Sequence, residues 1–175
     1  VLAPRINAAG RMGKAELAAE LFLTKDPVRA QALAAELCEQ NKLRQSEENK
    51  ILEQTLTRLR REYNPLEDKI IVLAGEGWHQ GVIGIVASRI VEVYYRPVLI
   101  LCSDGESLKG SGRSVPEFDL HAGLTRCADM LLGFGGHRQA AGLRIAPDRL
   151  DELRERFDAV IREELGEEPL TPSLK

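Results

Sequence analysis

Two short apolar runs separated by a helix-forming segment most constrain what this chain can fold into. Residues 69–74 read Lys-Ile-Ile-Val-Leu-Ala, and residues 97–102 read Pro-Val-Leu-Ile-Leu-Cys. Continuous apolar runs of this length are typical of strands that are buried on both faces of a parallel sheet. Residues 82–95, which lie between them, are apolar on most helical faces and predict a buried helix. The three segments therefore predict a βαβ unit with a right-handed crossover, and hence an α/β fold.

The segment that follows this unit alternates between strand and helix patterns. Residues 107–114 predict a more exposed strand, and residues 140–145 predict another. Asp119 is a suitable N-cap for a helix that ends near residue 128. The last predicted helix, residues 147–165, is amphipathic, and its inward residues are Leu150, Leu153, Phe157, Val160 and Ile161. Together these elements predict a mixed sheet flanked by helices.

A long helix is predicted to precede the sheet. Asp26-Pro27 is a strong helix start, and the helical pattern continues to about Tyr63, where Asn64-Pro65 ends it. At ~1.5 Å per residue such a helix is about 50 Å long. Its middle, residues 45–50, is polar on every face, which is typical of a helix that bridges two bodies through solvent. A coiled-coil seam is the alternative, although residues 45–50 do not provide the apolar residues that a coiled coil needs at its a and d positions.

The two ends of the chain predict little structure. Residues 1–13, with Pro4, Gly10 and Gly13, predict a loop, and residues 14–23 predict an alanine-rich helix. The chain begins without methionine and ends in a linker-like sequence, so we expect a piece of a longer protein. The expected divisions are an N-terminal stub, a connecting helix, a sheet-containing domain and a linker, at residues 1–25, 26–64, 65–168 and 169–175 respectively.

Charge and cysteine content restrict the partners and the compartment. The formal net charge is −3, so nucleic-acid binding would have to use a local basic patch. The 3 cysteines are far apart and form no C-x-x-C pair, which indicates a reducing compartment, and we expect a cytoplasmic protein. The sequence has no signal peptide and no apolar run long enough to span a membrane, so no membrane partner is expected. A mildly basic balance is found in the middle of the chain, at Lys109, Arg113, Arg126, Arg138 and Arg144.

Two glycine-rich motifs in this basic region are candidates for phosphate binding. They read Lys-Gly-Ser-Gly-Arg-Ser at residues 109–114 and Phe-Gly-Gly-His-Arg-Gln-Ala-Ala-Gly at residues 134–142, and we expect turns in both. Glycine lets backbone N–H groups approach a ligand, and the arginine fork binds two phosphate oxygens at once. Strand alternation would place Lys109, Ser111 and Arg113 on one face. His137 is expected on a loop, where it could donate to a phosphate oxygen. The alternatives are two ordinary tight turns, or a solvated edge strand whose cations discourage aggregation.

A third glycine-rich turn, at residues 75–81, lies between the first strand and its helix. Its last glycine is one residue late for the dinucleotide-binding G-x-G-x-x-G fingerprint, so it is a weak indication of a nicotinamide site. Trp78 and His79 could instead offer a flat stacking surface beside a groove for the nucleic-acid backbone, unless Trp78 simply caps the core. The 3 histidines are isolated in the sequence, and no complete metal site is expected.

These motifs, in this order, resemble a known family. Residues 77–89 (Gly-Trp-His-Gln-Gly-Val-Ile-Gly-Ile-Val-Ala-Ser-Arg), residues 110–114 and residues 134–142 look like the C-terminal half of the core of the RecJ family of bacterial single-strand-specific DNA exonucleases. Residues 3–13 resemble the end of the catalytic lobe of that family. The Gly-Gly-His element is shared more widely with DHH-family phosphoesterases, whose accessory DHHA1 domain binds nucleic acid or nucleotide.

The resemblance implies a DHHA1-like domain in a 5′→3′ exonuclease of recombination and repair that acts on single-stranded DNA with Mn²⁺ or Mg²⁺. It implies that the metals sit on an N-terminal DHH lobe, which is absent from this chain. This chain alone would therefore bind no metal and would be inactive. The resemblance also implies that a C-terminal OB-type domain is missing. Ser111 and Arg113 would hold the 5′-terminal phosphate, and His137 would face the catalytic cleft at the scissile phosphate. The predicted binding residues are Lys109, Ser111, Arg113, Gly135, Gly136, Trp78, His79 and Gln80. The alternative is the accessory lobe of a phosphoesterase that cleaves dinucleotides or short oligonucleotides.

Overall fold

The computed structural model describes residues 2–64, 67–168 and 170–172. The chain divides into two compact units, Val1–Lys50 and Ile51–Lys175, and helix α3 (Pro27–Glu62) belongs partly to each. The predicted helix from Asp26-Pro27 to about Tyr63 is therefore confirmed. Part of the predicted linker at residues 169–175 lies outside the described residues. Within the part of the chain that the structure describes, no helix has the length and apolar character needed to cross a bilayer.

The first unit is built from helices α1 (Ala3–Arg11), α2 (Ala15–Leu23) and the start of α3. The N–H of Val28 donates to Asp26 Oδ1 at 2.9 Å, which is the expected capping contact at the start of α3. A small apolar core joins the three helices and consists of Ala9, Leu17, Ala18, Leu33 and Leu37.

The predicted loop at residues 1–13 is wrong, because α1 occupies most of it. Pro4 sits in the first helical turn, where its missing N–H removes no helical bond. Gly10 is inside the helix, and only Gly13, with φ +77°, adopts the left-handed conformation that glycine favours. Proline and glycine at these positions are compatible with a helix, which their composition alone does not reveal.

The second unit contains a five-stranded mixed sheet with the order β1-β2-β3-β5-β4. Strand β1 (Ile71–Gly75) is parallel to β2 (Val98–Ser103), and helix α4 (Gln80–Tyr94) connects them. The predicted βαβ unit is thus confirmed. The remaining strands are antiparallel to their neighbours: β3 (Leu108–Arg113), β4 (Leu131–His137) and β5 (Ala140–Ile145).

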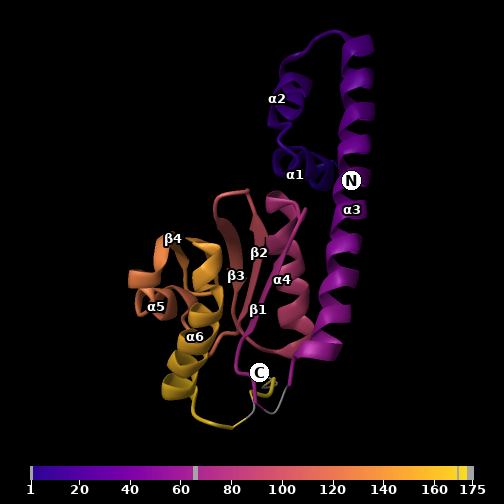
Figure 1. Cartoon of the computed structure of the whole chain (residues 1–175). Helices are drawn as coiled ribbons and strands as arrows, with labels where there is room; N and C mark the ends of the chain where they lie inside the picture. Colours follow the sequence, from indigo (N-terminus) through magenta and orange to yellow (C-terminus); the bar gives the residue numbers. More distant parts are fainter. Residues whose placement is uncertain (1, 65–66, 169, 173–175) are drawn as a thin grey trace. The chain divides into compact units, whose positions relative to one another are not determined.

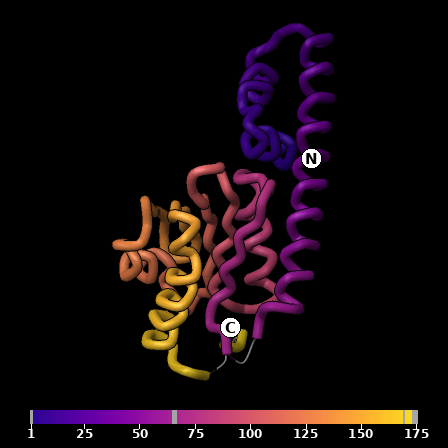
Figure 2. The backbone as a smooth tube through the Cα atoms, viewed as in Figure 1, coloured from indigo at the N-terminus to yellow at the C-terminus, as the bar shows by residue number. Residues whose placement is uncertain are grey.

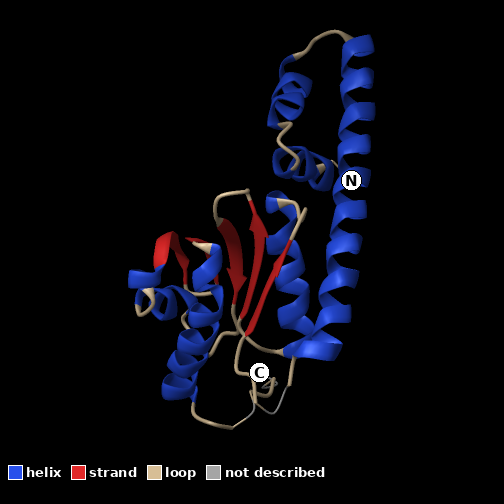
Figure 3. Cartoon of the chain, viewed as in Figure 1, coloured by secondary structure: helices blue, strands red, loops and turns tan. Residues whose placement is uncertain are grey.

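Helices cover the sheet on both faces (Figures 1 and 3). Helix α4 packs on β2 and β3. The other face carries α5 (Leu120–Thr125), the short 3₁₀ turns η1 (Ala128–Met130) and η2 (Pro147–Arg149), and α6 (Leu150–Leu165). The core on that face includes Phe118 and Phe157, whose rings meet edge to face with centroids 5.9 Å apart. Leu153, Phe157, Val160 and Ile161 are buried, as the amphipathic pattern predicts.

Three expectations about the strands are wrong. Residues 109–113 lie within β3 and pair with both neighbouring strands, so the turn expected at residues 109–114 is not formed. Strand β3 lies between β2 and β5, so the alternative of a solvated edge strand does not hold. Residues 134–137, expected as a turn, form the second half of β4, which pairs with β5 as far as His137 opposite Ala140. The turn itself contains only residues 138 and 139, between the two strands. The glycines of β4 conceal its strand character in the sequence, because they have low β-propensity.

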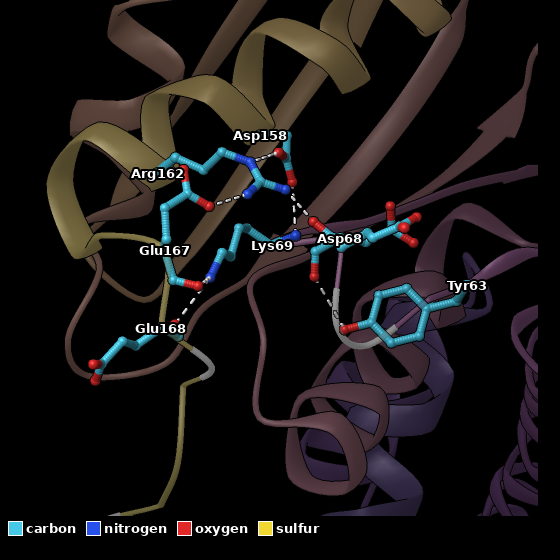
Figure 4. A network of polar contacts seen from close by, with 8 residues as sticks. Tyr63, Asp68, Lys69, Asp158, Arg162, Glu167 and Glu168 are labelled. Atoms are coloured by element: carbon cyan, nitrogen blue, oxygen red, sulfur yellow. Dashed lines mark hydrogen bonds and ion pairs between the residues drawn. The ribbon is translucent and has the colours of Figure 1, made fainter.

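A polar network fastens the end of α6 to the start of β1 (Figure 4). Lys69 is buried, its N–H donates to Asp158 Oδ1 at 2.6 Å, and its ammonium donates to the carbonyl oxygens of Glu167 and Glu168. Arg162 donates to Asp158, to Glu167 and to the carbonyl of Glu67. The chain after α6 therefore returns to the beginning of the sheet (Figure 2).

Candidate nucleic-acid interface

One face of β3, β5 and β4 carries five of the predicted site residues, namely Lys109, Ser111, Arg113, Gly135 and His137. Residues that are directly opposite in paired strands point to the same face. The strand register therefore produces cross-strand rows on this face, namely Arg113–Ala140–His137, Ser111–Gly142–Gly135 and Lys109–Arg144–Gly133. Because adjacent strands are ~4.8 Å apart, the two ends of a row are roughly 10 Å apart. In the first two rows the central residue is small, Ala140 or Gly142, and in the third row it is Arg144. The face thus forms a track that has small residues beside Ser111 and Arg113 and a basic end at Lys109 and Arg144.

Three residues of this track are glycines, although the packing of the fold does not require glycine at their positions. A Cβ added at Gly133 or Gly135 would meet no atom within 4 Å, and one at Gly142 would meet only the Gly110 carbonyl oxygen, at 3.8 Å. Glycine in a strand interior weakens the strand, and it often marks a place where a ligand or another backbone approaches closely. The neighbouring Gly136 is different, because its φ is +147° and a Cβ there would lie 2.4 Å from the Ala140 carbonyl oxygen.

Ser111 and Arg113 act as a pair at the wall of the track that adjoins α4. Arg113 Nη1 donates to Ser111 Oγ at 3.1 Å and to the Gly112 carbonyl oxygen at 2.7 Å. These bonds hold the guanidinium beside the hydroxyl, and the hydroxyl retains its own proton for donation to an anion. An arginine next to a serine hydroxyl is an arrangement that suits a phosphate group.

Lys109 and Arg144 form the basic end of the same face. Lys109 Nζ lies 3.4 Å from Asp104 Oδ2, and Arg144 Nη2 donates to Ser107 Oγ at 3.3 Å. Asp104 also accepts the backbone N–H groups of Ser107 and Glu106. These backbone bonds, with a smaller contribution from Lys109, lower the pKa of Asp104 to about 2. The Asp104 carboxylate orders the turn between β2 and β3. This turn contains Asp104, the partner of Lys109, and Ser107, the partner of Arg144.

His137 lies at the end of β4 on the same row as Arg113, with the small side chain of Ala140 between them. Its side chain is exposed. The structure therefore brings together two residues that are 24 positions apart in the sequence. The neighbouring Arg138 is turned away to the hairpin end, where Nη2 donates to the Pro116 carbonyl oxygen at 3.1 Å.

Of the predicted residues Trp78, His79 and Gln80, only Gln80 lines the groove on this face. Trp78 is buried, its ring lies on Gly75, and its Nε1 donates to Gln54 Oε1 at 2.7 Å. The ring therefore offers no open stacking surface, and its contacts support the alternative that Trp78 caps the core. His79 Nδ1 accepts the N–H of Gly81 at 3.0 Å, which caps α4. Gln80 is exposed in the first turn of α4.

A groove of about 300 Å³ lies at the basic end of this face, and its lining does not include Ser111, Arg113 or His137. The lining residues are Gln80, Lys109, Gly110, Gly133, Phe134, Gly142, Leu143 and Arg144. Gly133, Gly142 and Arg144 are missing from the residues predicted as a site. Their position depends on which strand pairs with β3 and in which register, and neither follows from local alternation. A signal was nevertheless present in the sequence, because Gly133, Gly135 and Gly142 interrupt segments that are otherwise apolar.

A larger cavity of about 490 Å³ lies along the free edge of β1, but its charge does not suit a polyanion. Carboxylates outnumber cations in its lining, which contains Glu62, Asp68, Glu155 and Asp158 against Arg154. Arg154 Nη2 donates to the Val72 carbonyl oxygen at 3.2 Å and so covers part of that strand edge. Charge therefore favours the glycine-floored face as the nucleic-acid site.

The sheet, its covering helices and the Gly-Gly-His strand define a recognised class of domain. Residues 67–163 match the DHHA1 domain family, and the chain belongs to this family.

The particular proteins that the chain resembles are bacterial RecJ exonucleases. The single-stranded-DNA-specific exonuclease RecJ of Bacillus subtilis is 39% identical over 173 residues, which are 98% of this chain and 22% of that protein. RecJ of Escherichia coli is 37% identical over 170 residues, 93% of this chain and 29% of that protein. The crystal structure of Thermus thermophilus RecJ in complex with Mg²⁺ superposes with a TM-score of 0.84 and 39% identity, over 93% of this chain and 25% of that one. The chain therefore spans less than a third of the length of these relatives.

Mg²⁺ and Mn²⁺ are present in RecJ crystal structures, so the fit of such an ion to this chain can be tested. Among residues 2–64, 67–168 and 170–172, no group of three or more His, Cys, Asp or Glu side chains is arranged to hold a metal ion.

Proposed function

We propose that this chain is the single-strand-binding DHHA1 portion of a longer 5′→3′ exonuclease that degrades single-stranded DNA in recombination and repair. The carrying observation is the face on which the Ser111–Arg113 pair and His137 border small residues, with Ala140 between Arg113 and His137 and the glycines Gly142 and Gly135 in the row of Ser111. The similarity to RecJ proteins over nearly the whole chain supports the same assignment.

In this proposal the track binds the sugar–phosphate backbone. Ser111 and Arg113 hold the 5′-terminal phosphate, and the backbone of the strand runs over Gly135 and Gly142, where no side chain keeps it away. Lys109 and Arg144 add positive charge at the other end of the face. Gln80 and the backbone N–H groups near Gly136 supply further donors. His137 faces the scissile phosphate from the opposite side of the row.

The cutting chemistry belongs to another part of the longer protein. An N-terminal DHH lobe would hold Mn²⁺ or Mg²⁺, which supplies the activated water and charge neutralisation for phosphodiester hydrolysis. An OB-type domain would follow this chain. His137 is the residue of this chain that would reach the reacting phosphate, where its ring N–H could donate to a phosphate oxygen.

Replacement of Arg113 by alanine in the full-length protein tests the end-recognition role. We expect the wild type to bind a 5′-phosphorylated single strand more tightly than the same strand with a 5′-hydroxyl. Arg113→Ala should reduce that preference about tenfold, the order of one charge-assisted hydrogen bond. Fluorescence anisotropy with both oligonucleotides measures the ratio.

The matched control is Arg126→Ala, because Arg126 lies at the end of α5 and pairs with Glu163 instead of facing the track. It should leave the ratio unchanged. A preference that survives Arg113→Ala removes Arg113 from the role. Turnover of a dinucleotide that exceeds turnover of a long single strand would instead favour a phosphoesterase of short oligonucleotides.

A further inference from the structure

Gly84 of helix α4 lies directly over the Ser111–Arg113 pair. A Cβ added at Gly84 would come within 2.8 Å of Ser111 Oγ and 3.0 Å of Arg113 Nη2. The next nearest atom is Ser111 Cβ, at 3.5 Å, which is an ordinary contact. The tight approaches are therefore to the polar tips of two flexible side chains, and the backbone is not involved.

The helix itself has no need of glycine at this position. Gly84 is buried in the helix interior, where glycine is less favourable than alanine because it loses more conformational entropy on folding. Its φ lies outside the left-handed region, in contrast to Gly77 in the preceding turn, with φ +66°. Alanine would thus make the helix at least as stable as glycine does. The glycine therefore has to be explained by the side chains that it contacts, Ser111 and Arg113.

We propose that Gly84 is a positioning residue for the phosphate site. The space left by its missing side chain holds the Arg113 guanidinium against Ser111 and aims both groups along the wall of the track. A methyl group there displaces the guanidinium or rotates the hydroxyl away, which breaks the 3.1 Å bond between them. This inference rests on the proposed function, because it concerns the geometry of the same terminal-phosphate site.

The substitution Gly84→Ala in the full-length protein tests this inference. We expect the preference for a 5′-phosphorylated over a 5′-hydroxyl single strand to fall about tenfold, the order of one charge-assisted hydrogen bond, while binding of the 5′-hydroxyl strand is nearly unchanged. The thermal midpoint should be equal to that of the wild type or higher. Gly10→Ala is the matched control, since Gly10 is also helical and a Cβ there meets nothing within 4 Å.

A double variant separates positioning from a general structural effect. If Gly84 acts through Arg113, then Gly84→Ala should change the ratio little in an Arg113→Ala background, because coupled residues are not additive. The positioning role is overturned if Gly84→Ala leaves the ratio of affinities for the 5′-phosphorylated and 5′-hydroxyl strands unchanged. It is also overturned if Gly84→Ala weakens binding of both strands equally and lowers the thermal midpoint. Either result leaves the proposed function standing. A wild-type protein without any 5′-phosphate preference overturns the end-recognition part of the proposed function instead.

Discussion

Adjacent glycines in β4 illustrate that one residue type can be present for different physical reasons. Gly136 needs its conformation and its space, because φ is +147° and a Cβ would meet the backbone at Ala140 and Ala141. Gly135 needs neither, because a Cβ there would project into open space. The first glycine is therefore explained by the fold, and the second is explained in the proposed function by a ligand that comes close to the strand.

This difference predicts opposite effects on stability. Gly136→Ala should lower the free energy of unfolding by about 1–3 kcal/mol, because alanine is strained at this φ and clashes with the backbone. Gly135→Ala should leave stability unchanged or raise it by about 0.4–1 kcal/mol, because the unfolded chain becomes less flexible. Urea unfolding measures both. Equal losses in the two variants would contradict the distinction, and weaker single-strand binding by the stable Gly135→Ala protein would support the ligand explanation.

At this scale, sequence reasoning predicted the residues whose placement depends on local geometry. Ser111 and Arg113 are two positions apart in a strand, so their common face follows from strand alternation. Arg144 reaches the same face only because β5 pairs with β3 in a particular register, which is a tertiary property. Trp78 could not be placed from the sequence, because its burial depends on contacts with Gly75 and with Gln54 on another element.

The turn between β2 and β3 is the element whose order depends most clearly on ionisation. Its carboxylate, Asp104, accepts two backbone N–H groups and pairs with Lys109, and its pKa falls from 3.8 to about 2. A lowered pKa in the folded state means that the carboxylate stabilises the fold above pH ~4, and that this contribution is lost as the pH falls towards 2.

Asp104→Ala should therefore lower the unfolding midpoint at pH 6, and the difference from the wild type should shrink between pH 4 and 2. Asp104→Asn keeps an acceptor oxygen without a charge, so its deficit relative to wild type should be smaller than that of Asp104→Ala at pH 6. Thermal unfolding across this pH range is the measurement. A difference between wild type and Asp104→Ala that is constant down to pH 2 would show that the ionised carboxylate does not stabilise the turn.

The elements that could be predicted from sequence are those with a strong hydrophobic period. The βαβ unit follows from two apolar runs, and α6 from its amphipathic stripe. Strand β4 lacks such a signal, since its glycines carry no side chains to alternate, and its pairing with β5 compensates for their low propensity. Helix α1 was missed because Pro4 and Gly10 resemble loop residues until the exact helical positions are known.

For the whole molecule, the two units have different physical roles in the proposed function. The second contains the track, and the first is a three-helix unit with a small apolar core. Because the net charge is −3, single strands would have to be attracted by a local basic group, which in this proposal consists of Lys109, Arg113 and Arg144. Affinity should therefore be modest and strongly reduced by salt, because only a few phosphates are neutralised.

The 175-residue chain by itself should bind single-stranded DNA without cutting it. Each phosphate contact should contribute a slope of about −0.7 to a plot of log K against log salt concentration, and Arg113→Ala should reduce the slope by roughly one contact. A 5′-phosphorylated oligonucleotide incubated with the chain and Mn²⁺ or Mg²⁺ should remain intact, because the described residues offer no ligand set for the cation. The full-length protein should degrade it under the same conditions. Degradation by the purified chain that a chelator abolishes would place the catalytic metal in this chain, and binding that does not respond to salt would exclude the track as a phosphate-binding surface.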